Sequence, residues 1–213
     1  KKYATDRKLD FISSPFSIKA AKLLKKINVK FWKIASGEVH NNELLNFCFK
    51  DKKPMLISTG LINDLELSNL YKKLKKNNKD FAFFHCVSRY PTEPEYWNLN
   101  KISQLKQKFK CKIGFSDHSG NIISSLAAAT IGVDFIEVHV TFDKNSFGPD
   151  TKSSIDMKQL KDLVNGVKQI DLSKKYNFKD NSKNKNKAIF SRSLALNKPM
   201  KKGSLIKLSD LTL

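Results

Sequence analysis

The stretch from Lys112 to His118 reads Lys-Ile-Gly-Phe-Ser-Asp-His, and residues 136–143 read Ile-Glu-Val-His-Val-Thr-Phe-Asp. Both runs have the composition of short buried β-strands, and each carries a histidine near its end, His118 and His139. Residues 121–132 between them are small and rich in Ala, long enough for one helix. A strand, a crossover helix and a second strand predict two parallel neighbouring strands. The two histidines would then lie side by side at the carboxyl ends of these strands, where α/β barrels carry their chemistry.

Two neutral imidazoles from adjacent strands are suitable ligands for a divalent metal ion. Asp117 directly precedes His118, and Asp150 follows the second strand, so carboxylates accompany both histidines. The alternative is structural, because a single histidine near a strand end often serves only as a hydrogen-bonded residue of the fold. The combination of two histidines with nearby carboxylates strengthens the case for a metal site, and both interpretations stay open at this point.

The composition indicates a folded domain with a strongly basic surface. Of the 213 residues, 40% are hydrophobic and 15 are Phe, which is enough for a packed core. The formal net charge of +20 would by itself favour a nucleic-acid partner. The excess is almost all Lys, mixed with Asn on the polar faces of expected helices, without a cluster of Arg and aromatic residues. We therefore predict a solvated surface and no nucleic-acid partner, although an anionic substrate would be attracted.

The three cysteines, Cys48, Cys86 and Cys111, are widely spaced and form no Cys-x-x-Cys pair. This usage fits a reducing, cytoplasmic location. No run of about 18 apolar residues occurs, so no membrane association is expected. The chain starts at Lys1 without a Met or an apolar signal region, and we expect that it begins inside a longer protein.

Six strand-then-helix units fit between Asp10 and Ile170, at a spacing of about 20 to 30 residues that is typical of parallel β/α folds. The expected strands are Phe11–Ser14, Lys30–Ile34, Met55–Ser58, Phe81–Cys86 and the two histidine runs. Apolar residues at helical spacing follow the strands, and the expected N-caps are Ser17, Asn41 or Asn42, Asn63 or Asp64, and Asp156. This order is that of an α/β barrel without its opening units.

Two further regions follow. Residues 171–187 are rich in Lys, Asn, Ser and Asp, which indicates a linker. Residues 188–213 contain short apolar runs around Lys202-Gly203 and indicate the start of a small β-rich module, too short to bury a core of its own. We therefore predict a barrel domain at 1–170, a linker at 171–187 and a truncated module at 188–213.

Six motifs in a fixed order carry a family resemblance. They are Phe-Ile-Ser-Ser-Pro-Phe (11–16), Lys-Ile-Ala-Ser-Gly-Glu (33–38), Ile-Ser-Thr-Gly (57–60), His-Cys-Val-Ser-Arg-Tyr-Pro (85–91), Ser-Asp-His (116–118), and Val-His-Val-Thr-Phe-Asp-Lys (138–144) with Gly-Pro-Asp (148–150). The chain resembles the sialic acid synthase family, which comprises the N-acetylneuraminate synthases and their legionaminic and pseudaminic acid relatives. The resemblance covers about residues 10–170, and the tail from Ser191 resembles the opening of that family's antifreeze-like C-terminal domain.

The resemblance implies a TIM (β/α)8 barrel lacking its first two strands, followed by the start of a small antifreeze-like (SAF-type) domain. It also implies a metal-dependent condensation of phosphoenolpyruvate with an N-acetylated amino sugar aldehyde, such as N-acetylmannosamine. The products would be a nine-carbon sialic-acid-type 2-keto acid and phosphate. The family's metal ligands match His118 and His139, so Mn²⁺ or Mg²⁺ bound there would polarise the sugar carbonyl. A homodimer is expected for the full-length protein.

The resemblance also assigns roles to single residues. Phosphoenolpyruvate-binding positions are matched by Ser14, Lys33, Ser36, Ser58 and Ser116, and a cation with hydroxyls suits phosphate and carboxylate. Positions that handle the sugar, water or protons are matched by Glu38, Ser88, Tyr90 and Asp150. Catalytic roles are therefore expected for Glu38, Tyr90, His118, His139 and Asp150.

Alternative interpretations remain for some of these residues. Lys33 could be a surface lysine, and Ser58 with Thr59 could cap the next helix. His85 lies within an apolar run and is expected to be a core residue, whereas His40 is expected in a loop.

Two departures from the family pattern affect the expected activity. Thr151 follows Gly-Pro-Asp where the family often has His, which leaves the sugar open. The family's first two strands, with a phosphate-binding lysine and an acidic residue, would precede Lys1, so these residues alone are expected to form an incomplete enzyme. Alternative functions are another phosphoenolpyruvate aldol-type synthase, and a non-catalytic lysine-rich binding protein on a degraded barrel.

Overall fold

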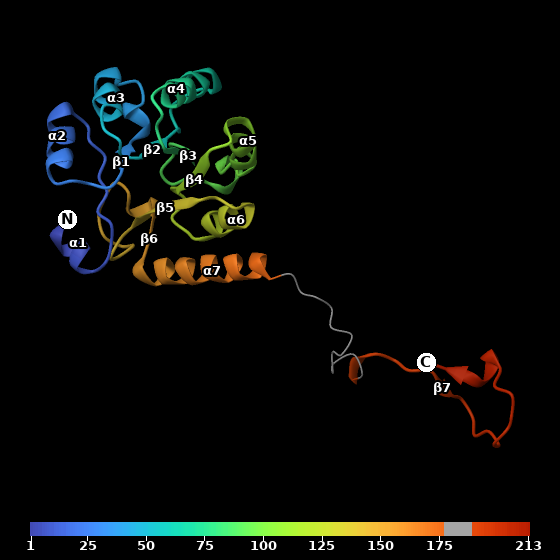
Figure 1. Cartoon of the computed structure of the whole chain (residues 1–213). Helices are drawn as coiled ribbons and strands as arrows, with labels where there is room; N and C mark the ends of the chain where they lie inside the picture. Colours follow the sequence, from blue (N-terminus) through green and yellow to red (C-terminus); the bar gives the residue numbers. More distant parts are fainter. Residues whose placement is uncertain (177–188) are drawn as a thin grey trace. The chain divides into compact units, whose positions relative to one another are not determined.

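The structure is a computed structural model and describes residues 1–176 and 189–213. The chain divides into two compact units, Lys1–Ser173 and Lys174–Leu213. The first unit contains a six-stranded parallel sheet whose strands follow the order of the sequence and curve into a half-barrel (Figure 1). The strands are β1 (Trp32–Ile34), β2 (Met55–Ser58), β3 (Phe81–Cys86), β4 (Lys112–Asp117), β5 (Phe135–Val140) and β6 (Ser154–Ile155).

Helices lie around the outer side of this sheet (Figure 1). The helices are α1 (Lys2–Asp6), α2 (Ile18–Lys26), α3 (Asn42–Phe49), α4 (Asp64–Lys76), α5 (Asn100–Phe109), α6 (Ile123–Ile131) and α7 (Met157–Lys175). Four helices begin at predicted N-caps, because the side chains of Ser17, Asn41, Asn63 and Asp156 accept backbone N–H groups of the first turns. Within the described part of the chain, no helix has the length and apolar character needed to span a membrane.

Alternate residues of each strand divide the sheet into two faces. The outer face packs against the helices through fully buried side chains: Trp32, Ile34, Met55, Ile57, Phe83 and Ile113. The inner face holds a smaller apolar cluster of Leu56, Ala82 and Phe84, with Phe31 and Phe135 packed against it. Gly114 belongs to the inner face, where an added Cβ would come within 2.7 Å of the Phe84 ring. The ring therefore lies over β4 only because this residue has no side chain.

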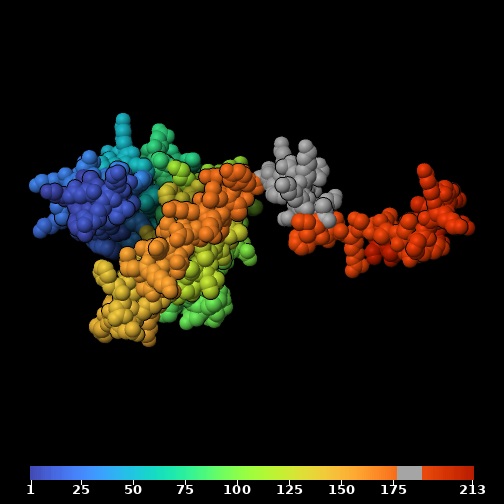
Figure 2. Space-filling model, turned by 90° about the horizontal axis from the view of Figure 1, so that it is seen from below, coloured from blue at the N-terminus to red at the C-terminus, as the bar shows by residue number. Residues whose placement is uncertain are grey.

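The last helix of the first unit is only slightly buried. Among the residues of α7, Leu163 alone is buried, and Figure 2 shows the helix, in orange, running across one face of the molecule. Because α7 extends to Lys175, residues 171–175 of the predicted linker are helical, which fits the good helix formers Leu172, Lys174 and Lys175. Residues 177–187 of that linker lie outside the described residues.

The strand prediction is wrong at one position. Residues 11–14 are not in a strand, and Ile12 is 37% exposed. Apolar composition predicts burial, but a strand also requires a partner for its backbone N–H and C=O groups, and composition carries no information on pairing. The sixth strand is instead β6, in which Ser154 and Ile155 pair with His139 and Val140. Two residues are too few for a recognisable alternation, so the sequence did not predict it.

The second unit contains a small antiparallel pair, β7 (Ala195–Leu196) with β8 (Leu211–Thr212). The buried carboxylate of Asp210 supports it by accepting the backbone N–H of Lys207 at 3.0 Å and pairing with Lys198 at 2.7 Å. Many apolar side chains around it remain exposed, including Leu205 and Leu208. This small pair has little apolar burial of its own.

Candidate functional site

A cleft of about 660 Å³ opens on the inner face, at the carboxyl ends of the strands. Its lining includes nine of the residues predicted from the sequence: Ser14, Lys33, Ser36, Ser58, Ser88, Tyr90, Ser116, His118 and His139. The first of them comes from the loop before α2 and the rest from β1–β5 or the loops after them. Parallel strands bring these distant positions to one edge, as the strand-end argument expected.

Lys33 lies in the middle of β1 and points to the inner face, with 8% of its surface exposed. Its Nζ donates a hydrogen bond to Ser58 Oγ and lies 3.4 Å from Glu137 Oε2. The ammonium group is also 5.1 Å from the centroid of the Phe84 ring, which forms part of the inner apolar cluster. Lys33 is therefore a buried cation of the site, and the surface-lysine interpretation is wrong.

Glu137 is a residue of the cleft that the sequence interpretation did not single out. It lies on β5 two residues before His139, and its Oε1 accepts a hydrogen bond from Ser116 Oγ at 2.8 Å. Its other oxygen faces Lys33, so this carboxylate connects β1 with β4 across the cleft. Strand alternation places Glu137 and His139 on one face, and that signal could have found it.

His118 follows the last residue of β4 and is held in one orientation. Its Nδ1 lies 2.9 Å from the carbonyl oxygen of Val87, which can only accept, so Nδ1 carries the proton. Nε2 is then a lone-pair acceptor, 3.3 Å from Tyr90 Oη and 3.4 Å from Ser116 Oγ. Burial lowers the pKa of this imidazole, which favours the neutral form that a metal ion requires.

His139 faces the same space from β5. The centroids of its ring and the His118 ring are 5.2 Å apart, and the Tyr90 ring stacks on His118 at 4.3 Å. Asp150 lies outside the cleft lining but reaches His139, with 3.7 Å between Oδ2 and Nδ1. Within the described residues, no group of three or more His, Cys, Asp or Glu forms a metal site. Two imidazoles would therefore need oxygen ligands from water or a substrate, as open catalytic sites do.

The position of His118 depends on a buried carboxylate beside it. Asp117 is 4% exposed and accepts hydrogen bonds from the Ser119 backbone N–H at 2.9 Å, from Ser125 Oγ at 2.6 Å and from Ser124 Oγ. These bonds tie the turn after β4 to the first turn of α6. Asp117 thus orients the loop that presents His118, and it does not itself face the cleft.

The remaining serines line the cleft near the ends of β1, β2 and β3. Ser36 Oγ accepts the Gly60 backbone N–H at 3.0 Å. An added Cβ at Gly60 would lie 2.7 Å from Cys86 Sγ and from Ser88 Oγ, so the chain approaches these side chains closely there. Ser58 bonds to Lys33, and Asn63 caps α4, so the helix-cap interpretation of Ser58 is wrong.

The other predicted residues lie farther from the cleft. Glu38 accepts a hydrogen bond from Asn41 Nδ2 at 2.9 Å and does not line the cleft. His85 is a core residue as predicted, because it is 6% exposed and its Nε2 lies 3.0 Å from the Trp97 carbonyl oxygen.

Several known proteins are similar to this chain in sequence and in fold. The N,N'-diacetyllegionaminic acid synthase of Campylobacter jejuni is 36% identical over 207 residues, which are 95% of this chain and 62% of that protein. Human N-acetylneuraminate-9-phosphate synthase is 33% identical over 171 residues, 80% of this chain and 48% of that protein. The crystal structure of N-acetylneuraminic acid synthetase from Leptospira borgpetersenii matches with a TM-score of 0.80 at 30% identity, covering 89% of this chain and 66% of that one.

The chain therefore spans 48% to 62% of the length of these two curated relatives. The family resemblance found in the motifs is confirmed by a family model that matches residues 1–179. By this match, the chain belongs to the NeuB family.

Proposed function

We propose that the protein condenses phosphoenolpyruvate with an N-acetylated amino sugar aldehyde, giving a nine-carbon 2-keto acid and phosphate. The single observation that carries the proposal is the buried Lys33, surrounded by hydroxyls and placed in one cleft with the facing imidazoles of His118 and His139. The relatives' names refer to syntheses of sialic-acid-type products. An anionic substrate and a polarised carbonyl are the two requirements of such a condensation.

Phosphoenolpyruvate would bind at the β1–β4 side of the cleft. Lys33 supplies the positive charge, and the hydroxyls of Ser58, Ser36 and Ser116 supply donors for phosphate and carboxylate oxygens. Ser14 and Ser88 complete the lining on either side. Binding would draw Lys33 from its shared contact with Glu137, because a ligand with several negative charges competes for the ammonium group.

His118 and His139 would hold Mn²⁺ or Mg²⁺, which supplies Lewis-acid polarisation of the sugar carbonyl when bound. The electron pair of the phosphoenolpyruvate C2–C3 double bond forms the new bond to the aldehyde carbon, whose oxygen gains a proton. Water then adds at C2 and loses one proton, and the second proton is lost as phosphate leaves with the C–O bond electrons and the C2 carbonyl forms. Glu137, which accepts a hydrogen bond from Ser116, and Asp150, which lies beside His139, would accept protons, and Tyr90 Oη, which lies beside His118, would bind the sugar.

We also propose that the six strands are the last six of a (β/α)8 barrel. The half-barrel leaves two open sheet edges, at β1 and β6, which two further strands would close. The second unit would be the start of an antifreeze-like domain, and the active protein would be a homodimer. The short β7–β8 pair is compatible with such a start.

The test is phosphate release from phosphoenolpyruvate with Mn²⁺ or Mg²⁺, measured over a panel of N-acetylated hexosamines and simple aldoses. The proposal predicts release that requires both the metal and one N-acetylated sugar. Release with a plain aldose phosphate instead would indicate another aldol-type synthase on the same barrel. Binding of single-stranded RNA without any phosphoenolpyruvate binding would contradict both assignments.

A further inference from the structure

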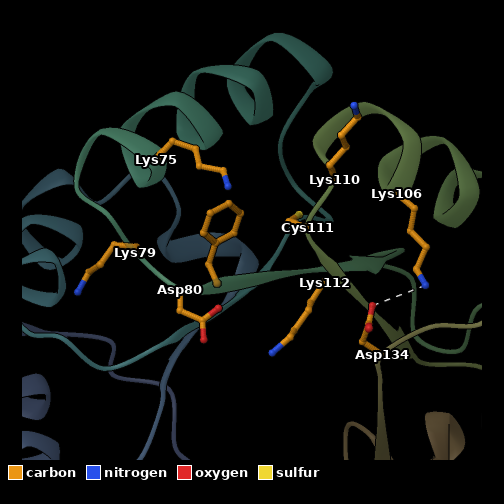
Figure 3. A pocket seen from close by; sticks show the side chains of 9 residues that line it. Lys75, Lys79, Asp80, Lys106, Lys110, Cys111, Lys112 and Asp134 are labelled. Atoms are coloured by element: carbon orange, nitrogen blue, oxygen red, sulfur yellow. Dashed lines mark ion pairs between the residues drawn. The ribbon is translucent and has the colours of Figure 1, made fainter.

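A second cavity lies at the opposite end of the same strands. It has a volume of about 500 Å³ and opens at the amino ends of β3, β4 and β5, away from the cleft with the histidines. Five lysines line it: Lys75, Lys79, Lys106, Lys110 and Lys112 (Figure 3). Strands of six residues extend about 20 Å, so a ligand here would not touch the substrate cleft.

Two of the five lysines do not present a free ammonium group to the cavity. Lys106 donates to the Gly132 carbonyl oxygen and lies 3.6 Å from Asp134. Lys79 is buried and points away from the centre of the cavity (Figure 3). The other three, Lys75, Lys110 and Lys112, are exposed. Within the described residues, none of these three has an ion pair with a carboxylate.

A structural explanation would be that the lysines balance the negative ends of helices. α4 and α5 both end beside this cavity, and each helix C-terminus carries about half a negative charge. Two such ends amount to about one charge, which one lysine would balance. Lys106 already balances Asp134, and the remaining carboxylate, Asp80, would balance one more lysine. A positive charge is left over at the rim of the cavity.

Lys110 has a backbone conformation that is unusual for lysine and that it shares with Lys8 after α1. It ends α5 with a φ of 47°, in the left-handed region. The corresponding positions after α2, α4 and α6 have Asn28, Asn78 and Gly132, residue types that adopt this conformation at low cost. Lysine has no comparable preference for the left-handed region, so backbone conformation does not explain a lysine at this position. Its side chain brings a further positive charge to the rim of the cavity.

The floor of the cavity is apolar. Phe81 and Cys111 line the cavity together with the lysines. Burial raises the pKa of the Cys111 thiol to about 11, so it adds no negative charge. The Lys75 ammonium is 5.8 Å from the Phe81 ring centroid and 5.6 Å from that of Tyr71. A basic rim over an aromatic floor suits an organic anion better than a bare ion.

We propose that this cavity binds a small phosphate ester, with its phosphoryl group held by Lys75, Lys110 and Lys112. Three flexible ammonium groups match a phosphoryl group as point charges, and the ester's carbon portion would lie over Phe81. The volume of about 500 Å³ fits a small molecule better than a nucleic-acid strand, which requires a long basic groove with several stacking side chains. The site is separate from the proposed active site, and binding there does not depend on catalysis.

The test titrates glycerol phosphate and inorganic phosphate into the protein, followed by calorimetry and by amide NMR shifts. The site variant is Lys75→Gln/Lys110→Gln/Lys112→Gln. The matched control, Lys19→Gln/Lys22→Gln/Lys26→Gln, removes the same charge from exposed positions on α2. We expect glycerol phosphate to shift amides near Asp80 and Cys111, and its affinity to fall at least about tenfold in the site variant and less than about twofold in the control.

The two ligands separate the possible sources of a phosphoryl group. Tighter binding of the ester than of inorganic phosphate supports use of the apolar floor, whereas equal binding contradicts the ester assignment. If both triple variants lose the same affinity for glycerol phosphate, the site is overturned. It is also overturned if the amide NMR shifts are confined to residues near Ser116 and His118. Single-stranded RNA binding that is lost in the site variant, without binding of either small anion, overturns it in favour of a nucleic-acid surface. Thermal unfolding of both variants verifies that they are folded. If the triple site variant does not fold, Lys112→Gln alone replaces it in the titrations.

Discussion

Trp32 and Ile34 have no exposed surface and pack against helices, whereas Lys33 between them points into the cleft and meets Ser58 and Glu137. β3 and β5 each supply one side of this division. Phe83 is fully buried on the outer face, and His139 lies on the inner face beside His118. One-residue alternation therefore lets a single strand serve the core with one face and the site with the other.

The stability of the fold and the chemistry of the site can therefore be changed separately. Outer-face side chains contribute through area removed from water. Inner-face side chains near the carboxyl ends are polar and are held by a few hydrogen bonds. Mutations on the two faces should therefore have different readouts, even at adjacent positions.

The largest effect on stability is expected on the outer face. Phe83→Ala removes a fully buried ring that packs against Phe81 and Phe109. We expect a loss of about 3–5 kcal/mol in the free energy of unfolding, measured with urea. A loss below about 1 kcal/mol would contradict this division between the faces, because it would mean that the outer face is not the main core.

The largest effect on activity is expected on the inner face. His118→Ala should lower metal-dependent turnover by more than about a hundredfold, since even outer-shell partners of a metal cost up to that much. Its unfolding free energy should fall by less than that of Phe83→Ala. Turnover and metal affinity equal to those of the unchanged protein would rule out the metal assignment, and His85→Gln is the control histidine.

Much of this division could be predicted from the sequence. The strands from Met55, Phe81 and Lys112 were identified because their apolar runs are long and are followed by helical periodicity. The two histidines are predicted because each lies near the end of a strand-like run, whereas Lys33 and Ser58 are predicted from the family resemblance. Glu137 was missed because a carboxylate next to apolar residues gives no motif, and only its alternation with His139 would have indicated it.

Other features depend on pairing in three dimensions. Residues 11–14 have a strand-like composition but form no strand. Residues 154–155 form the strand β6 although their sequence shows no strand-like pattern. In both cases a strand forms only where a distant segment supplies a backbone hydrogen-bond partner. The local sequence does not encode that partner. The contact of Asp150 with His139 is of the same kind, because it joins a loop to β5.

A smaller effect concerns pH and a histidine away from the cleft. Burial lowers the pKa of His85, so the folded state binds fewer protons than the unfolded chain between the two pKa values. Its contribution to stability is present above about pH 6.5 and is lost as the pH falls toward the folded pKa. Urea unfolding at pH 7.5 and at lower pH should show a smaller pH dependence for His85→Gln. An identical dependence in both proteins would contradict the role of burial.

The central claim is that the inner face at the carboxyl ends of the strands binds phosphoenolpyruvate through Lys33. The most direct measurement compares the KM for phosphoenolpyruvate and for the sugar in Lys33→Met. The control is Lys53→Met, because Lys53 also has a mostly buried side chain and pairs with Asp51 at 3.3 Å. The account predicts that Lys33→Met raises the KM for phosphoenolpyruvate by about ten- to hundredfold, with the KM for the sugar nearly unchanged and no such change in the control. Equal changes in both KM values, or an unchanged KM for phosphoenolpyruvate, would contradict it.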